Sequence, residues 1–192
     1  MAQVAKLEHT RGGGESELLE MIRTRSMRLG RFTLASGRES DLYLNLKPTM
    51  MDPRGARLCA EALLGRVPPG TDYVGGLEMG AVPVIAALAA VSDIAGRPVK
   101  TFFVRKSAKD HGTKEVVEGL MTGEHLAGKR LLMVDDVATT GGSVIKAIEA
   151  ARAAGGIVDD ALVIVDRQEG GTEALAAIGV KLASVFVGDD FR

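Results

Sequence analysis

Two adjacent carboxylates, Asp135 and Asp136, stand between a run of four apolar residues and a loop of small residues. The apolar run, 131–134, has no polar alternation, which is typical of a strand buried on both faces of a parallel sheet, where ligands collect at the carboxyl end. The loop from Thr139 to Ser143 can aim backbone N–H groups at a phosphate on the positive end of a following helix. Because paired carboxylates suit ribose hydroxyls or a hydrated magnesium ion, the sequence predicts a site for a phosphorylated sugar.

The same segment has a plainer interpretation, since many α/β proteins have a strand, an acidic turn and a Ser- or Thr-capped helix without binding anything. Two threonines, two glycines and a serine after two acids exceed what one cap requires. The string resembles the phosphoribosyl-diphosphate (PRPP) motif of type I phosphoribosyltransferases. The resemblance implies that Asp135 and Asp136 hold Mg²⁺, through water. It implies PRPP contacts from Asp135, Asp136, Val137, Ala138, Thr139, Thr140, Gly141, Gly142 and Ser143.

A second group of chemically active residues is cationic and follows an expected strand at 100–104. It consists of Arg105, Lys106, Lys109 and His111, with Gly112 to loosen the chain. A solvated turn is the alternative interpretation. A diphosphate gains negative charge as its bond to ribose breaks, so Lys and Arg could neutralise it and His could donate a hydrogen bond or a proton. A loop that closes only over bound substrate would also protect the transfer from water.

This loop narrows the resemblance, because Arg105-Lys106 followed by Lys109-Asp110-His111-Gly112 is similar to the catalytic loop of the orotate phosphoribosyltransferase family. Enzymes of this family transfer the phosphoribosyl group of PRPP to orotate, giving orotidine 5'-phosphate and pyrophosphate in pyrimidine synthesis. The resemblance implies a homodimer in which the loop 105–117 reaches the neighbouring active site. It implies catalytic roles for Arg105, Lys106, Lys109, His111, Asp135 and Asp136.

Two further segments resemble the same family: residues 32–40 with Tyr43, and residues 165–170. Arg167 is the residue expected on orotate, because a guanidinium grips a carboxylate in a bidentate way that Lys cannot. A salt bridge to a neighbouring acid is its alternative role. Thr139 could hydrogen-bond the orotate ring, and Tyr43 could stack on it.

The chain departs from some family members at two positions. Ala35 and Met79 stand where those enzymes carry lysine. The resemblance then implies that the loop cations, magnesium and backbone N–H groups near Met79 carry more of the diphosphate charge.

The remaining sequence predicts an α/β fold of the type I phosphoribosyltransferase kind, with a mostly parallel central sheet flanked by helices. Strands are expected at 73–76, 100–104, 131–134, 161–165 and 182–187, and helices at about 80–91, 142–154 and 171–178. Residues 1–14 read as a flexible tail, and 15–192 as one domain whose small N-terminal hood is formed mainly by 15–50. Within the hood, Ser16 is expected to cap a helix that includes Met27, strands are expected at 32–34 and 42–46, and Asp52 is expected to cap a helix to about Leu64.

Composition narrows the function classes. The 192 residues are 46% hydrophobic with a net charge of -1, so one packed domain is expected and no basic field favours nucleic acid or an anionic membrane. The single cysteine, Cys59, lies in an apolar stretch and is expected to be a buried structural thiol. Because one cysteine cannot form an internal disulfide, a cytoplasmic location is expected. The longest apolar run is too short to span a bilayer.

Two alternatives to an orotate enzyme remain open at this level. A phosphoribosyltransferase for a purine or uracil would share the PRPP motif and differ in the hood. A PRPP-sensing regulator without catalysis would need a surface that binds nucleic acid. The near-neutral net charge of the chain argues against such a surface.

Overall fold

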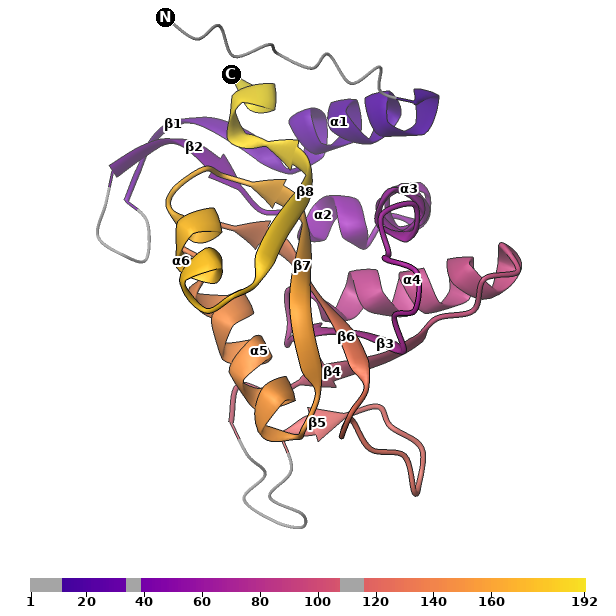
Figure 1. The fold of residues 1–192 in the computed structure, drawn as a ribbon. Coiled ribbons are helices and arrows are strands. Elements are labelled where there is room, and N and C mark those ends of the chain that lie inside the picture. Colours follow the sequence, from indigo (N-terminus) through magenta and orange to yellow (C-terminus); the bar gives the residue numbers. More distant parts are fainter. Residues whose placement is uncertain (1–11, 34–38, 108–115) are drawn as a thin grey trace, which may run out of the picture.

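A six-stranded sheet with the order β5-β4-β3-β6-β7-β8 forms the centre of the fold (Figure 1). The structure is a computed structural model, and it describes residues 12–33, 39–107 and 116–192. Every neighbouring pair in the sheet is parallel except β4 with β5, which is antiparallel. The strands are β3 (Tyr73–Leu77), β4 (Lys100–Val104), β5 (Val117–Glu118), β6 (Arg130–Ala138), β7 (Ile157–Asp166) and β8 (Lys181–Val187).

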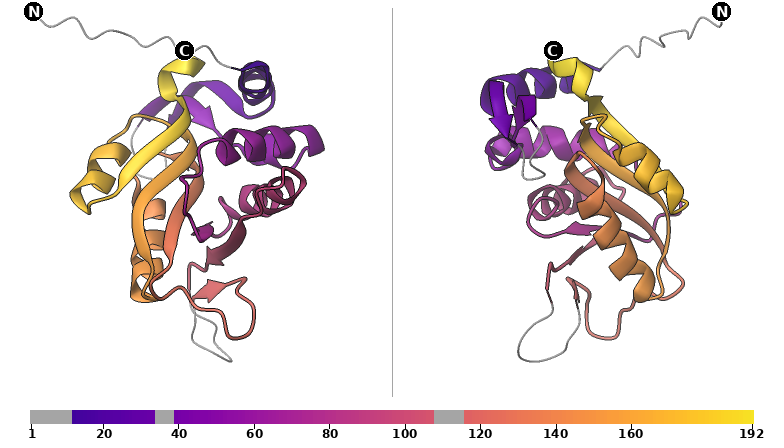
Figure 2. Two further views of the ribbon diagram at one scale, coloured as in Figure 1. Left: turned by 45° about the vertical axis from the view of Figure 1, so that its right-hand side comes forward. Right: turned by 90° about the vertical axis from the view of Figure 1, so that its left-hand side faces the viewer.

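Helices cover both faces of this sheet (Figure 2). Helices α3 (Pro53–Leu64) and α4 (Val82–Ile94) pack on one face, and α5 (Gly142–Ala153) and α6 (Gly171–Ala177) on the other. A short 3₁₀ turn, η1 (Gly188–Phe191), ends the chain. The predicted α/β class with a mostly parallel sheet is therefore confirmed.

The centre of β6 shows why the apolar run forms a strand. Leu132 and Val134 belong to the cluster under α3 and α4, whereas Leu131 and Met133 belong to the cluster under α5. Side chains alternate between the faces of a strand, so a strand covered on both sides must be apolar at every position. The four residues are each no more than 5% exposed, and burial of a strand on both faces is confirmed.

The hood is a separate small layer made by α1 (Gly13–Arg25), the hairpin of β1 (Met27–Thr33) and β2 (Glu39–Leu44), and α2 (Lys47–Met50). The hairpin lies over the end of the sheet at which β6 and β7 finish (Figure 1). Leu18 and Ile22 of α1 are fully buried and join the main core through α3. The hood is thus packed onto the sheet rather than tethered to it.

Several local predictions needed correction. The cap of α1 is Gly12, without a side-chain hydrogen bond, so the prediction of Ser16 as cap is wrong. Met27 begins a strand instead of continuing the helix. The Asp52 cap is confirmed, because its carboxylate accepts hydrogen bonds from the backbone N–H groups of Arg54 and Gly55, at 3.0 Å each.

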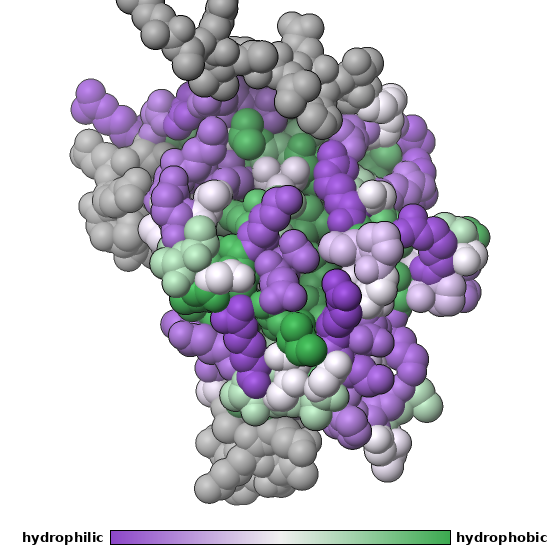
Figure 3. Space-filling view, viewed as in Figure 1, coloured by the Kyte–Doolittle hydropathy of each residue, from purple (hydrophilic) through white to green (hydrophobic). Residues whose placement is uncertain are grey.

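Polar and charged side chains cover most of the face shown in Figure 3, and apolar ones gather mainly in a strip over β7 and β8. Within residues 12–33, 39–107 and 116–192, no helix combines the length and the apolar content needed to cross a bilayer. Cys59 is fully buried in α3, as expected of a structural thiol. Burial raises the pKa of its thiol to about 12, which leaves it protonated and unreactive near neutral pH.

Candidate active site

The two central strands, β3 and β6, mark the point where the chain reverses its direction across the sheet. After β3 the chain crosses through α4 to β4 on one side, and after β6 it crosses through α5 to β7 on the other. The loops that leave these two strands therefore diverge to opposite faces and open a crevice between them, which is where open α/β sheets bind ligands. The predicted site residues on β6 lie at this crevice.

Asp135 and Asp136 lie within β6 rather than after it, because the pairing of β6 with β7 continues to Ala138 opposite Asp166. Asp135 is only 5% exposed, and its Oδ1 accepts a hydrogen bond from the N–H of Asp136 at 2.9 Å. Asp136 is half-buried, and its Oδ1 accepts from the N–H of Val137 at 2.9 Å. Backbone hydrogen bonds thus orient both carboxylates.

The environment of Asp135 disfavours its charged form in the ligand-free protein. Burial, and next the negative charge of Asp136, raise the pKa of the Asp135 carboxyl well above its usual range. Backbone hydrogen bonding and the positive charge of Lys47 act in the opposite direction and only partly offset this. The two carboxyl groups can therefore still gain a hydrogen bond from a ligand hydroxyl group, or charge compensation from a bound cation.

The loop after β3 closes the other side of the crevice and needs glycine there. A Cβ atom on Gly80 would lie 2.7 Å from Oδ1 of Asp135 and 2.8 Å from Oδ1 of Asp136. The peptide bond between Glu78 and Met79, just before it, is cis. Backbone thus approaches both carboxylates closely, so the acids of β6 and the loop after β3 form one surface.

The loop after β6 delivers the start of α5 beside the acids. Gly141 is the N-cap of α5, it has a φ of 80°, and no side-chain hydrogen bond caps the helix. A side chain there would also collide with Leu175, at 2.7 Å from its Cβ. Because the first turn of a helix leaves N–H groups without partners inside the helix, this uncapped end can bind a phosphate through backbone amides. The Ser or Thr cap of the plainer interpretation is absent from this described segment.

The described cations, Arg105 and Lys106, follow β4 and line a cavity of about 660 Å³ together with Ser143 of α5. Arg105 lies 3.4 Å from Glu118, and its Nε atom is buried without a hydrogen-bond partner among the described residues. Lys106 is exposed. The structure therefore brings these two predicted cations close to the start of α5. Lys109 and His111 lie outside the described residues.

The comparisons with known proteins agree with this geometry. The family described as "Phosphoribosyl transferase domain" matches residues 54–181. An orotate phosphoribosyltransferase from Bradyrhizobium sp. (strain ORS 278) is 50% identical over 183 residues, which is 95% of this chain and 99% of the relative. The chain belongs to the orotate phosphoribosyltransferase family. The match takes in the hood as well as the PRPP motif, since it extends well beyond residues 54–181.

Solved structures of the orotate phosphoribosyltransferase family have the same fold. The Mycobacterium tuberculosis H37Rv enzyme, in complex with Fe(III) dicitrate, superposes with a TM-score of 0.80 at 37% identity, covering 93% of this chain and 98% of that one. A structure of the M. tuberculosis enzyme in complex with PRPP has a TM-score of 0.76 at 33% identity, with the same coverage.

Of the three residues expected to contact orotate, Tyr43 lies on the hood, Arg167 directly follows β7 and Thr139 directly follows β6. Arg167 is only 6% exposed, and its Nη2 lies 2.7 Å from Oε1 of Glu169, so the salt bridge weighed as its alternative role is present. Tyr43 is 41% exposed and packs against Phe32, with 5.5 Å between the ring centroids. In this chain the arginine directly follows β7 of the sheet and the aromatic ring belongs to β2 of the hood, so the two side chains come from different layers.

The donor chemistry of the acidic pair, two carboxylates, decides whether it fits magnesium. Among the described residues, no group of three or more His, Cys, Asp or Glu side chains could hold a metal ion. Magnesium is commonly held by one or two carboxylates, waters and substrate phosphates, and not by a complete protein cage. Asp135 and Asp136 fit this mode.

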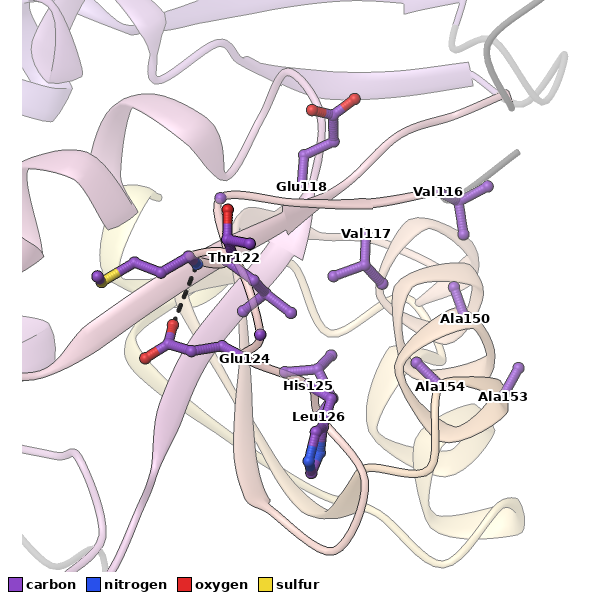
Figure 4. Close-up of a pocket in the computed structure, with 14 residues that line it drawn as sticks. Val116, Val117, Glu118, Thr122, Glu124, His125, Leu126, Ala150, Ala153 and Ala154 are labelled. Carbon is purple, nitrogen blue, oxygen red and sulfur yellow. Dashed lines mark hydrogen bonds between the residues drawn. The ribbon is translucent and has the colours of Figure 1, made fainter. Parts of the chain in front are cut away.

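The structure describes only one of the two positions at which this chain departs from some family members. Met79 is 60% exposed on the loop after β3, and Ala35 lies outside the described residues. One residue near the site, Glu78, was not singled out from the sequence, because its contact with Lys106 joins residues 28 positions apart. A second cavity of about 640 Å³ between residues 116–126 and the end of α5 adjoins the first, because both are lined by Val116, Ala150 and Ala153, but none of the predicted site residues lines it (Figure 4).

Proposed function

We propose that the protein catalyses the transfer of the 5-phosphoribosyl group of PRPP to orotate, giving orotidine 5'-phosphate and pyrophosphate in the synthesis of UMP. The observation that carries this proposal is the crevice between β3 and β6, where two oriented carboxylates adjoin the uncapped start of α5. Family membership supports orotate rather than a purine as the acceptor.

Binding of PRPP would use three parts of the crevice. The amides and hydroxyls of Thr139 to Ser143 would hold the 5'-phosphate at the start of α5, and Asp135 and Asp136 would accept hydrogen bonds from the ribose hydroxyls. Arg105 and Lys106 would contact the diphosphate, with Lys109 and His111 by resemblance to the family. When bound, magnesium would neutralise part of the diphosphate charge, and the two acids would hold it through water.

Transfer would then require little covalent help from the protein. A ring nitrogen of ionised orotate forms a bond to C1 of the ribose while the bond from C1 to the diphosphate oxygen breaks, and the electron pair leaves with pyrophosphate. The chain contributes by holding the reactants in line and by placing cations where negative charge grows. Arg167 would grip orotate, Thr139 would donate to its ring, and Tyr43 would stack on it.

The working assembly we propose is a homodimer in the cytoplasm, in which the loop 105–117 of one subunit reaches the active site of the other. This proposal is supported by resemblance to the family. Mixing two inactive variants, one altered at Lys109 and one at Asp136, would test it. Recovery of activity in the mixed dimer is expected if the loop acts across the interface, and no recovery would contradict it.

The experiment for the function itself is an absorbance assay of orotate consumption with PRPP, with and without magnesium. Orotate should be consumed only with both present, and pyrophosphate should appear in equal amount. A parallel panel with adenine, hypoxanthine and uracil serves as the control for acceptor choice. Turnover of one of these bases without turnover of orotate would refute the proposal.

A further inference from the structure

Glu78, the first residue after β3, connects the loop beside the acids with the start of the cationic segment, Arg105 and Lys106, that follows β4. Its backbone N–H donates to the carbonyl of Val104 at 2.8 Å, which continues the pairing of β3 with β4 by one residue. Its Oε1 accepts a hydrogen bond from the N–H of Lys106, also at 2.8 Å. Two residues further along, Gly80 lies against both carboxylates.

The two amides that follow β4 are both engaged in this arrangement. The N–H of Arg105 donates to the carbonyl of Val116 at 2.8 Å, and the N–H of Lys106 donates to Glu78. Backbone amides in folded proteins are nearly always paired, and here one of the two pairs depends on a single side chain. The direction of the chain at Arg105 and Lys106 is therefore set in part by Glu78.

A carboxylate at this place is informative because it lies beside the cavity that the two cations line. Like charge would oppose an approaching diphosphate, so a glutamate here weakens binding unless it contributes in another way. The hydrogen bond to Lys106 is such a contribution, because it supplies an acceptor to a backbone amide that would otherwise lose its partner.

We propose that Glu78 is a positioning residue that fixes the backbone of Lys106, and with it the cations Arg105 and Lys106, at a set distance from Asp135 and Asp136. A ribose held by the acids would then present its diphosphate to both cations. This inference rests on the proposed function, because it takes PRPP as the ligand.

The test compares four variants with the wild-type protein. Glu78→Ala removes the acceptor, Glu78→Asp keeps the charge but is too short to reach Lys106, and Glu78→Gln keeps the acceptor without the charge. Glu124→Ala is the matched control, because Glu124 also accepts a backbone N–H, that of Met121 at 3.2 Å, but lines only the second cavity and not the one lined by Arg105 and Lys106 (Figure 4). Thermal unfolding checks that each variant is folded.

Calorimetry with PRPP and with ribose 5-phosphate, both with magnesium, provides the readout, because only PRPP carries the diphosphate. Glu78→Ala and Glu78→Asp should bind PRPP at least about tenfold more weakly, the lower end of the effect of losing one hydrogen bond to a charged group. Their affinity for ribose 5-phosphate should stay within about twofold of the wild-type value, as should the affinity of Glu78→Gln and Glu124→Ala for PRPP. In turnover assays, Glu78→Ala and Glu78→Asp should raise KM for PRPP more than they lower kcat.

Three outcomes would overturn the inference. These are unchanged PRPP binding in Glu78→Ala, an equal loss for PRPP and ribose 5-phosphate, and a Glu78→Gln variant as weak as Glu78→Ala. If Glu78→Ala does not fold, Glu78→Asp decides alone by the same criteria. Failure of the wild-type protein to bind PRPP would instead refute the proposed function, and the inference with it.

Discussion

Replacement of Gly80 by alanine tests whether the loop after β3 and the acids of β6 work as one surface. The new Cβ would lie 2.7 Å from Oδ1 of Asp135 and 2.8 Å from Oδ1 of Asp136, well inside ordinary contact distance. Asp135 is 5% exposed, so it has little room to withdraw without losing the 2.9 Å hydrogen bond from the N–H of Asp136.

The expected cost has two parts. Loss of one such hydrogen bond and local overpacking should lower the free energy of unfolding by about 1–3 kcal/mol. Displaced carboxylates would also no longer meet the ribose hydroxyls. One charged hydrogen bond lost in this way weakens PRPP binding by about 1.5–3 kcal/mol, which is roughly 10-fold to 150-fold.

Calorimetric titration with PRPP and magnesium measures the second part, and urea unfolding measures the first. Gly65→Ala is the matched control, because Gly65 has a φ of -61° and its nearest neighbour would lie 3.7 Å from the added Cβ. The control should bind PRPP as the wild-type protein does. A Gly80→Ala variant that also binds PRPP normally would refute the placement of ribose on these acids.

Three further changes have defined outcomes. Cys59 holds its proton to about pH 12 when folded but only to about 9.0 when unfolded, so stability falls as pH rises through this window. In urea unfolding at pH 8 and 10.5, the wild-type protein should lose about 2 kcal/mol more than Cys59→Ala, and equal losses would contradict the buried thiol. Arg167→Lys should raise KM for orotate at least about tenfold in steady-state kinetics and leave KM for PRPP unchanged; an equal rise in both would count against its role. Asp52→Ala should lower the free energy of unfolding by about 1 kcal/mol through loss of the helix cap, with kcat unchanged; no change in stability would contradict the cap.

The sequence was most informative where local pattern and tertiary packing agree. The strand at 100–104 and the start of α5 at Gly142 were predicted to the residue, because each has a β-rich or helical pattern next to a clear turn signal. The end of β6 was predicted too early, since adjacent acids read as a turn. Pairing with β7 carries the strand on to Ala138, which only the assembled sheet could show.

The hood was harder to predict because its local signals are weak. Helix α1 begins with two glycines, which are poor helix formers, and it is held by the burial of Leu18 and Ile22 instead. The hairpin strands came out longer than expected, at 27–33 and 39–44 in place of 32–34 and 42–46. In the site, the types of the cations and acids were readable from the sequence. The Glu78 contact was not, because it depends on tertiary approach, whereas the Arg167–Glu169 salt bridge was weighed as an alternative role from the sequence.

The most direct test of the central claim is a crystal structure with PRPP and magnesium bound. The 5'-phosphate should lie on the amides of Thr139 to Ser143, and the ribose hydroxyls should lie within hydrogen-bond distance of Asp135 and Asp136. A sugar phosphate bound elsewhere on the molecule, with these carboxylates facing only protein, would contradict the account.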